Sequence, residues 1–147
     1  MYSRILVATD GSELSRKAVD AAISLAEVTK AEVVAIKVIP AYPQSYFEGA
    51  IVLAPQEISR IEEQWATEAA SVVQAVQAAA NTKKVTVQPI TVKSDQIGET
   101  LIRQAVKLHC DLIVMASHGR RGLNRFFLGS ETQYVLAHST LPVMVLR

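Results

Sequence analysis

Five short apolar runs alternate with longer segments of helical periodicity, and this alternation restricts the fold more than any other feature of the chain. The runs are residues 4–9, 32–39, 85–91, 112–116 and 143–146. Their content of Val, Ile and Leu is typical of β-strands buried in a sheet. Between the runs, apolar residues recur at a spacing of three or four, which indicates helices. The predicted helices span about residues 12–28, 56–80, 97–108 and 130–138.

Strands and helices that alternate at about thirty residues per unit predict a parallel sheet, because each helix returns the chain to the edge where the previous strand began. We therefore expect one domain over residues 1–147: an α/β, Rossmann-like fold with an open parallel five-stranded sheet and helices on both faces. Ligands of such sheets bind beyond the carboxyl ends of the strands, where the strand order reverses. Residues 8–12 and 115–130 follow strand ends and are expected to meet there.

Two strands are expected at the edges of the sheet. Pro89 lies within one of them, and its missing N–H is tolerated at an edge. The other, Val143–Leu146, is short, apolar and close to the end of the chain. Exposed edges pair readily with a second copy. We therefore expect a homodimer formed through Val143–Leu146.

Charge and composition exclude several classes of protein. Lys and Arg number 15 and Asp and Glu 14, so no strong field draws the chain to nucleic acid or to acidic lipid. No apolar run approaches the roughly 18 residues that a membrane span requires, and the first ten residues contain too short an apolar stretch for a signal peptide. The single cysteine, Cys110, excludes an internal disulfide. We expect a cytoplasmic protein that binds neither nucleic acid nor membranes.

The segment from Ala116 to Ser130 has the pattern of an anion-binding turn. Ala116-Ser-His-Gly119 ends the fourth strand, and Gly129-Ser130, where a helix begins, follows after nine intervening residues. The first N–H groups of a helix have no intrahelical acceptor, and the helix dipole adds roughly half a positive charge there. Glycines at 119 and 129 allow the backbone to approach a phosphate closely.

Plainer explanations of the same residues stay open. Ser130-Glu-Thr-Gln133 has the spacing of a capping box, in which Ser130 would only begin the helix. Three arginines lie between the two glycines, Arg120 among them. They can bind phosphates in a bidentate manner, or they can form a solvated surface. His118 can approach a phosphate or be an ordinary turn residue.

The chain resembles the universal stress protein family from end to end. The resemblance is carried by Ile5-Leu-Val-Ala-Thr-Asp10-Gly-Ser, Met115-Ala-Ser-His-Gly-Arg-Arg-Gly-Leu, Gly129-Ser-Glu-Thr-Gln and Leu141-Pro-Val-Met-Val-Leu-Arg147. The ATP-binding signature of the family is Gly, two residues, Gly, nine residues, Gly, then Ser or Thr. Gly119, Gly129 and Ser130 match this signature, whereas Ala116 stands in place of its first glycine.

This resemblance implies a fold of the adenine-nucleotide alpha hydrolase-like kind that binds ATP, with Mg²⁺ or Mn²⁺ held mainly by the phosphates. Asp10 would contact the nucleoside or its metal, and Val38 would contact adenine. Met115 and Ala116 would line the floor beneath the ribose and phosphates, while glycines and hydroxyls of the signature segment would bind the phosphates. The cofactor-binding residues are then Ala8, Thr9, Asp10, Val38, Met115, Ala116, His118, Gly119, Arg120, Gly129, Ser130, Glu131 and Thr132.

The function implied by the resemblance is that of a dimeric stress-response regulatory factor, which hydrolyses ATP slowly or not at all. Two alternatives stay open. One is an enzyme that transfers phosphoryl or nucleotidyl groups at the same site, and the other is an interaction module that binds no nucleotide. The Walker A lysine pattern is absent, as is a Gly-x-Gly-x-x-Gly turn after the first strand, which argues against a P-loop ATPase and a dinucleotide-dependent dehydrogenase. A further protein partner is compatible with each function.

Overall fold

The computed structural model describes residues 1–41, 54–119 and 128–147. Strands and helices alternate along the chain as the sequence predicts. The strands are β1 (Arg4–Ala8), β2 (Glu32–Ile39), β3 (Val87–Lys93), β4 (Leu112–Ala116) and β5 (Val143–Leu146). The helices are α1 (Glu13–Thr29), α2 (Pro55–Asn81), α3 (Ile97–Lys107) and α4 (Ser130–His138).

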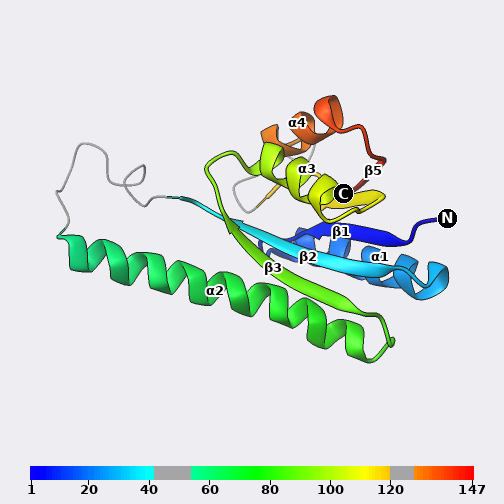
Figure 1. Cartoon of the computed structure of the whole chain (residues 1–147), viewed down its shortest axis with the longest axis horizontal. Coiled ribbons are helices and arrows are strands. Elements are labelled where there is room, and N and C mark those ends of the chain that lie inside the picture. Colours follow the sequence, from blue (N-terminus) through cyan, green and yellow to red (C-terminus); the bar gives the residue numbers. More distant parts are fainter. Residues whose placement is uncertain (42–53, 120–127) are drawn as a thin grey trace.

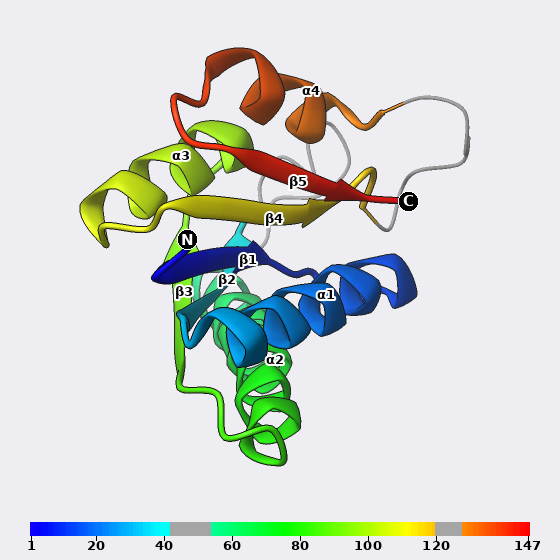
Figure 2. The same cartoon turned by 90° about the vertical axis from the view of Figure 1, so that its right-hand side faces the viewer.

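All neighbouring strands are parallel, and their order is β3-β2-β1-β4-β5. The predicted parallel five-stranded sheet is therefore confirmed, as is the placement of β3 and β5 at its edges. Helices α3 and α4 cover one face of the sheet, and α1 and α2 cover the other (Figures 1 and 2). The strand order reverses between β1 and β4, so the carboxyl ends of these two strands flank the expected ligand site.

The core consists of two apolar layers, one on each face of the sheet. Side chains of β1 alternate between them: Ile5 and Val7 pack with α1 and α2, whereas Leu6 packs with α3 and α4. All three are fully buried. Each contributes about 1.5–3 kcal/mol relative to an exposed position, so the central strands form a stable base for the loops at their carboxyl ends.

Helix α1 begins as predicted, with Ser12 as its N-cap. The Ser12 hydroxyl accepts a hydrogen bond from the Ser15 N–H at 3.2 Å. Strand β3, in contrast, begins and ends two residues later than predicted. Its start is delayed because Val85 donates its N–H to Ala80 O and so closes the end of α2. It continues to Lys93 because its parallel partner β2 extends to Ile39.

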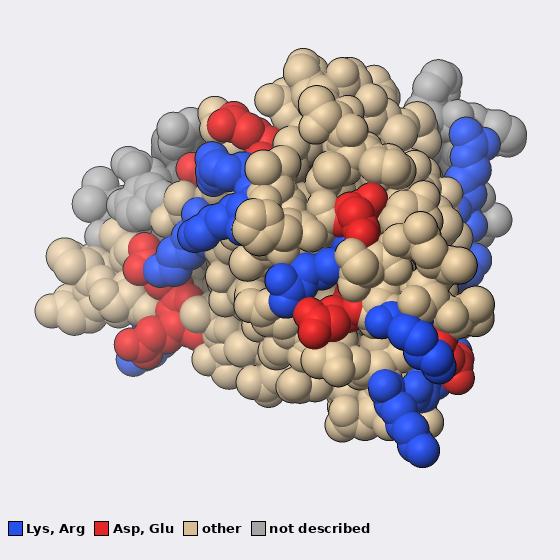
Figure 3. Space-filling model, turned by 45° about the vertical axis from the view of Figure 1, so that its right-hand side comes forward, with Lys and Arg blue, Asp and Glu red and all other residues tan. Residues whose placement is uncertain are grey.

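Charged side chains of both signs are interspersed on the face shown in Figure 3, in keeping with the near balance of acidic and basic residues. None of the helices in the described ranges combines the length and the apolar content needed to cross a bilayer.

At the amino end of the sheet, Asp111 joins the start of β1 to the start of β4. Its carboxylate accepts hydrogen bonds from Ser3 N and Ser3 Oγ, each at 2.7 Å, and from Arg4 N at 3.1 Å. Partial burial raises the pKa of the Asp111 carboxyl, but the hydrogen bonds from Ser3 and Arg4 outweigh this effect and hold the pKa below its ordinary value of 3.8. The ionised carboxylate therefore stabilises the fold.

Asp111→Asn should lower the melting temperature by a few degrees at neutral pH and by less in acid. Because the folded-state pKa lies below the unfolded value of 3.8, the contribution of the carboxylate is complete above about pH 5 and is lost as the pH falls through the folded-state pKa. Asparagine does not titrate. Thermal melts across this range should show a gap between wild type and variant that narrows below about pH 4. If the difference in melting temperature stayed constant in acid, ionisation of Asp111 would not contribute to the stability of the fold.

Candidate functional site

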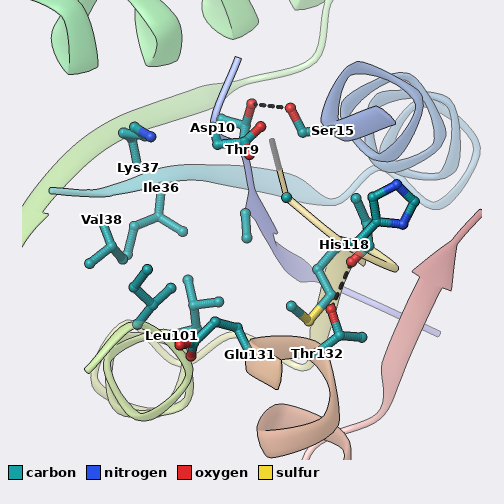
Figure 4. A pocket seen from close by; sticks show the side chains of 15 residues that line it. Thr9, Asp10, Ser15, Ile36, Lys37, Val38, Leu101, His118, Glu131 and Thr132 are labelled. Carbon is teal, nitrogen blue, oxygen red and sulfur yellow. Dashed lines mark hydrogen bonds between the residues drawn. The ribbon is translucent and has the colours of Figure 1, made fainter. Parts of the chain in front are cut away.

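A cavity of about 160 Å³ lies at the carboxyl edge of the sheet, where the strand order reverses (Figure 4). The loops after β1 and β4, the end of β2, and the first turns of α3 and α4 all contribute to its wall. The two segments expected to meet at this edge therefore do so. The lining residues are Ala8, Thr9, Asp10, Ser15, Ile36, Lys37, Val38, Ile97, Leu101, Met115, Ala116, His118, Gly119, Glu131 and Thr132.

One end of the cavity is polar and is shaped by hydrogen bonds within the β1–α1 turn. The Asp10 carboxylate accepts from Ser12 N at 2.9 Å, and Thr9 Oγ1 accepts from Gly11 N at 3.3 Å. The hydroxyls of Thr9 and Ser15 are 3.2 Å apart (Figure 4). Gly11 has a φ of 79°, a conformation that glycine adopts without strain. These contacts hold the Asp10 side chain at the rim of the sheet.

The opposite end of the cavity is apolar. Ile36 and Val38 come from the end of β2, Met115 comes from β4, and Ile97 and Leu101 come from α3. Figure 4 shows Ile36, Val38 and Leu101 on the side away from Asp10. A flat apolar ring fits between such side chains, while polar substituents of the same ligand reach the other end.

Gly119 brings the loop after β4 close to the loop after β1. A Cβ atom at this position would lie 3.1 Å from Asp10 Oδ2, closer than a side chain normally packs. A glycine here therefore allows the two loops to approach each other at the polar end of the cavity. Gly119 is itself exposed, so its backbone is accessible from solvent.

The first turn of α4 is attached to the end of β4. Gly129 N donates to Ser117 O at 2.7 Å, and Thr132 Oγ1 donates to Ala116 O at 2.9 Å. These bonds direct the amino terminus of α4, with its positive end of the dipole, toward the loop that lines the cavity. Thr132 is buried, and its hydroxyl is already engaged as a donor to the backbone.

The capping-box explanation of this segment is wrong. Gly129 is the N-cap of α4, and Ser130 is the first helical residue and is exposed. The Gln133 side chain donates to Leu128 O instead of reaching an N-cap amide, because the helix begins one residue earlier than the capping box requires. Ser130 is therefore not needed to start the helix.

Ten of the thirteen residues predicted for the site line the cavity. Gly129 and Ser130 lie beside it at the start of α4, and Arg120, like the other loop arginines, lies outside the described residues. Ile36 and Lys37 were missed, although they precede Val38 at the same strand end. Three further lining residues, Ser15, Ile97 and Leu101, come from α1 and α3. They line the cavity because of the way these helices pack onto the sheet, which the local sequence pattern does not specify.

Cys110 is a buried thiol on the face covered by α3 and α4. Burial raises the pKa of its thiol to about 11, so it stays protonated and unreactive at neutral pH. Across the ranges that the structure describes, no three His, Cys, Asp or Glu side chains are grouped so as to hold a metal ion.

A parallel sheet with helices on both faces, and with a cavity at the point where its strand order reverses, defines a domain of the Rossmann-like class. Residues 1–147, the whole chain, match the model of the universal stress protein family, and the chain belongs to this family. It is 30% identical to universal stress protein YxiE of Bacillus subtilis, over 100% of both chains. It is 31% identical to universal stress protein MJ0531 of Methanocaldococcus jannaschii, over 100% of this chain and 83% of that protein.

Solved structures share the same fold. The hypothetical protein MJ0577 superposes with a TM-score of 0.83 at 25% identity, covering 99% of this chain and 96% of that chain. A universal stress protein in complex with cAMP gives a TM-score of 0.67 at 20% identity, covering 98% and 95% of the two chains. The universal stress protein of Archaeoglobus fulgidus in complex with dAMP gives 0.67 at 15% identity, covering 99% and 98%.

Proposed function

We propose that this protein binds ATP in the cavity at the carboxyl edge of its sheet and acts as a dimeric regulatory factor in the stress response. The observation that carries the proposal is a cavity that is apolar at one end and polar at the other and whose wall includes the first turn of α4. Two proteins of the same fold form complexes with adenine nucleotides, cAMP and dAMP, which supports this choice of ligand class.

In this proposal adenine lies against Val38 and the other apolar side chains from β2 and α3. The ribose lies over Met115 and Ala116, near Asp10. The phosphates reach Gly119 and the amides of the first turn of α4, which have no intrahelical acceptor. Ala116, in place of a glycine, already lines the cavity, so in this proposal the ligand packs over its methyl group.

A divalent cation, Mg²⁺ or Mn²⁺, would be held mainly by the phosphates of ATP. Among the described lining residues, Asp10 is the carboxylate at the polar end and is the side chain that fits a role beside such a cation. When bound, the cation would neutralise phosphate charge.

We expect ATP hydrolysis to be slow or absent. The side chains of the cavity wall that could act as a general base already have hydrogen-bond partners among the described residues. Asp10 accepts from Ser12 N, His118 Nδ1 is 3.1 Å from Ser117 Oγ, and Glu131 accepts from a backbone amide. A water molecule attacking a phosphate would have to compete for them.

Isothermal titration calorimetry of the ligand-free protein with ATP, AMP and adenosine tests the proposal. We expect ATP and AMP to bind, and adenosine to bind more weakly, because it makes no contact with the amino terminus of α4. The absence of binding by all three ligands would contradict the proposal and would favour an interaction module. Phosphate release well above the protein-free rate would favour an enzyme.

The proposed dimer would form through the exposed edge of β5. Pro142 O and Leu146 O accept hydrogen bonds from the amides of Ile113 and Ser117. Because backbone groups alternate in direction along a strand, the even-numbered residues of β5 face β4, and the N–H groups of Val143 and Val145 point outward. Antiparallel pairing of two such edges would use these outward groups.

Val145→Pro should weaken self-association by about tenfold or more. The variant removes one outward N–H from each copy, and two lost hydrogen bonds correspond to roughly 1–3 kcal/mol. Val145→Ala is the matched control, because it shortens the same side chain and keeps the N–H. Sedimentation of both variants and the wild type measures the dissociation constants. A wild-type protein that is monomeric at high micromolar concentration would rule out the dimer.

A further inference from the structure

Helix α3 begins without a cap of its own. Its N-cap is Gln96, whose side chain makes no capping hydrogen bond among the described residues. The amides of the first turn, those of Ile97 and Gly98 included, have no acceptor within the helix. This helix terminus matters for the site because Ile97 and Leu101 form part of the apolar wall of the cavity.

The missing acceptor comes from α4. Glu131, in the first turn of that helix, accepts a hydrogen bond from Gly98 N at 2.6 Å. Figure 4 shows the Glu131 side chain extending from α4 toward α3. A carboxylate at this place interacts favourably with the positive end of the α3 dipole, and a hydrogen bond to an ionised acceptor is stronger than one between neutral groups.

Gly98 is the position that makes this contact possible. A Cβ atom there would lie 2.8 Å from Tyr134 Cδ1 and 3.0 Å from Glu131 Oε2, so a larger residue would displace these side chains or the helix that carries them. Gly98 is buried beneath these two side chains. The close approach of α3 and α4 therefore depends on a glycine in one helix and a carboxylate in the other.

The first turn of α4 thus has connections to two different parts of the site. Through Gly129 and Thr132 it is bonded to the end of β4. Through Glu131 it is bonded to α3, which carries part of the apolar wall. The Glu131 hydrogen bond therefore connects the apolar wall on α3, against which a base would pack, to the amino terminus of α4, which a phosphate would reach.

We propose that Glu131 is a positioning residue that caps α3 from α4, and that this cap holds the apolar wall on α3 and the amino terminus of α4 at the separation required by a nucleotide. The inference rests on the proposed function and adds to it, since it assigns Glu131 a role through α3 rather than a contact with phosphate. A free carboxylate in this turn would repel phosphate, whereas the negative charge of Glu131 is compensated by the amide and the positive dipole end of α3.

Calorimetric titration with ATP and with adenosine tests the proposal on Glu131→Ala, Glu131→Gln and Glu99→Ala. We expect Glu131→Ala to weaken ATP binding by about tenfold and adenosine binding by less than about threefold, because only ATP spans both ends. Glu131→Gln retains an acceptor oxygen and should stay within about threefold of the wild type. Glu99→Ala removes a surface carboxylate from the first turn of α3 and should change neither affinity.

Amide hydrogen exchange of the ligand-free proteins provides a second readout. The Gly98 amide should exchange faster in Glu131→Ala than in the other three proteins. Unchanged Gly98 exchange, unchanged ATP affinity, or equal losses for ATP and adenosine in Glu131→Ala would each overturn the inference. So would a Glu131→Gln protein as weak as Glu131→Ala. A wild type that binds no nucleotide would instead show that the proposed function is wrong.

Discussion

Saturating ATP with a divalent cation should raise the melting temperature of the wild-type protein by about 5–10 °C. At a hundred times its dissociation constant, a ligand that binds only the folded state stabilises it by about 2.7 kcal/mol. For a domain of this size each kcal/mol corresponds to about 2–4 °C. Differential scanning fluorimetry with and without ATP measures the shift.

Ile97→Trp should abolish most of this shift. Ile97 lines the cavity and is 37% exposed, so an indole there can enter the apolar slot at little cost to the ligand-free fold. Val106→Trp is the matched control, because Val106 lies on the same helix, is 55% exposed and is not part of the cavity wall. A full ATP shift in Ile97→Trp would place the nucleotide elsewhere.

Gly129→Val should lower the melting temperature of the ligand-free protein by roughly 2–12 °C. A Cβ at this position would lie 3.3 Å from His118 Cα and 3.4 Å from Ser117 O, so a branched side chain would push α4 away from the end of β4. Overpacking of this kind lowers the free energy of unfolding by about 1–3 kcal/mol. For a domain of this size, each kcal/mol lowers the melting temperature by about 2–4 °C. A glycine at position 129 is therefore needed for the packing of α4 on the end of β4, in addition to any contact with phosphate.

Ser130→Ala is the control for this variant. If Ser130 were the N-cap, its loss would cost about 1 kcal/mol. Because Ser130 is exposed and already within α4, we expect the ligand-free Ser130→Ala protein to have the same melting temperature as the wild type. A clear destabilisation by Ser130→Ala, or none by Gly129→Val, would contradict the observed start of α4.

The fold could be predicted because its pattern is local. Each strand is a continuous apolar run and each helix has its own periodicity, so the element order follows from residues that are neighbours in the chain. The site could be predicted in outline for a related reason. Parallel strands bring their carboxyl ends to one edge, so Asp10 after β1 and Gly119 after β4 were expected to meet.

The remaining features depend on contacts between distant segments. The Glu131–Gly98 hydrogen bond joins residues 33 positions apart, and neither residue type signals the other. Ile97 lines the cavity only because α3 packs over the end of β2. The start of α4 differs from the capping-box pattern because hydrogen bonds to Ser117 and Ala116 fix it, and these bonds outweigh local propensity.

The proposed ATP site lies at the carboxyl edge of the sheet, between the ends of β1, β2 and β4. Titration of ¹⁵N-labelled protein with ATP, followed through its amide chemical shifts, tests this location. We predict the largest changes at Asp10, Val38, Gly119 and Gly129, and little change at Asp111 on the opposite edge. Largest changes at the amino edge of the sheet, or along the outer face of α2, would contradict the account.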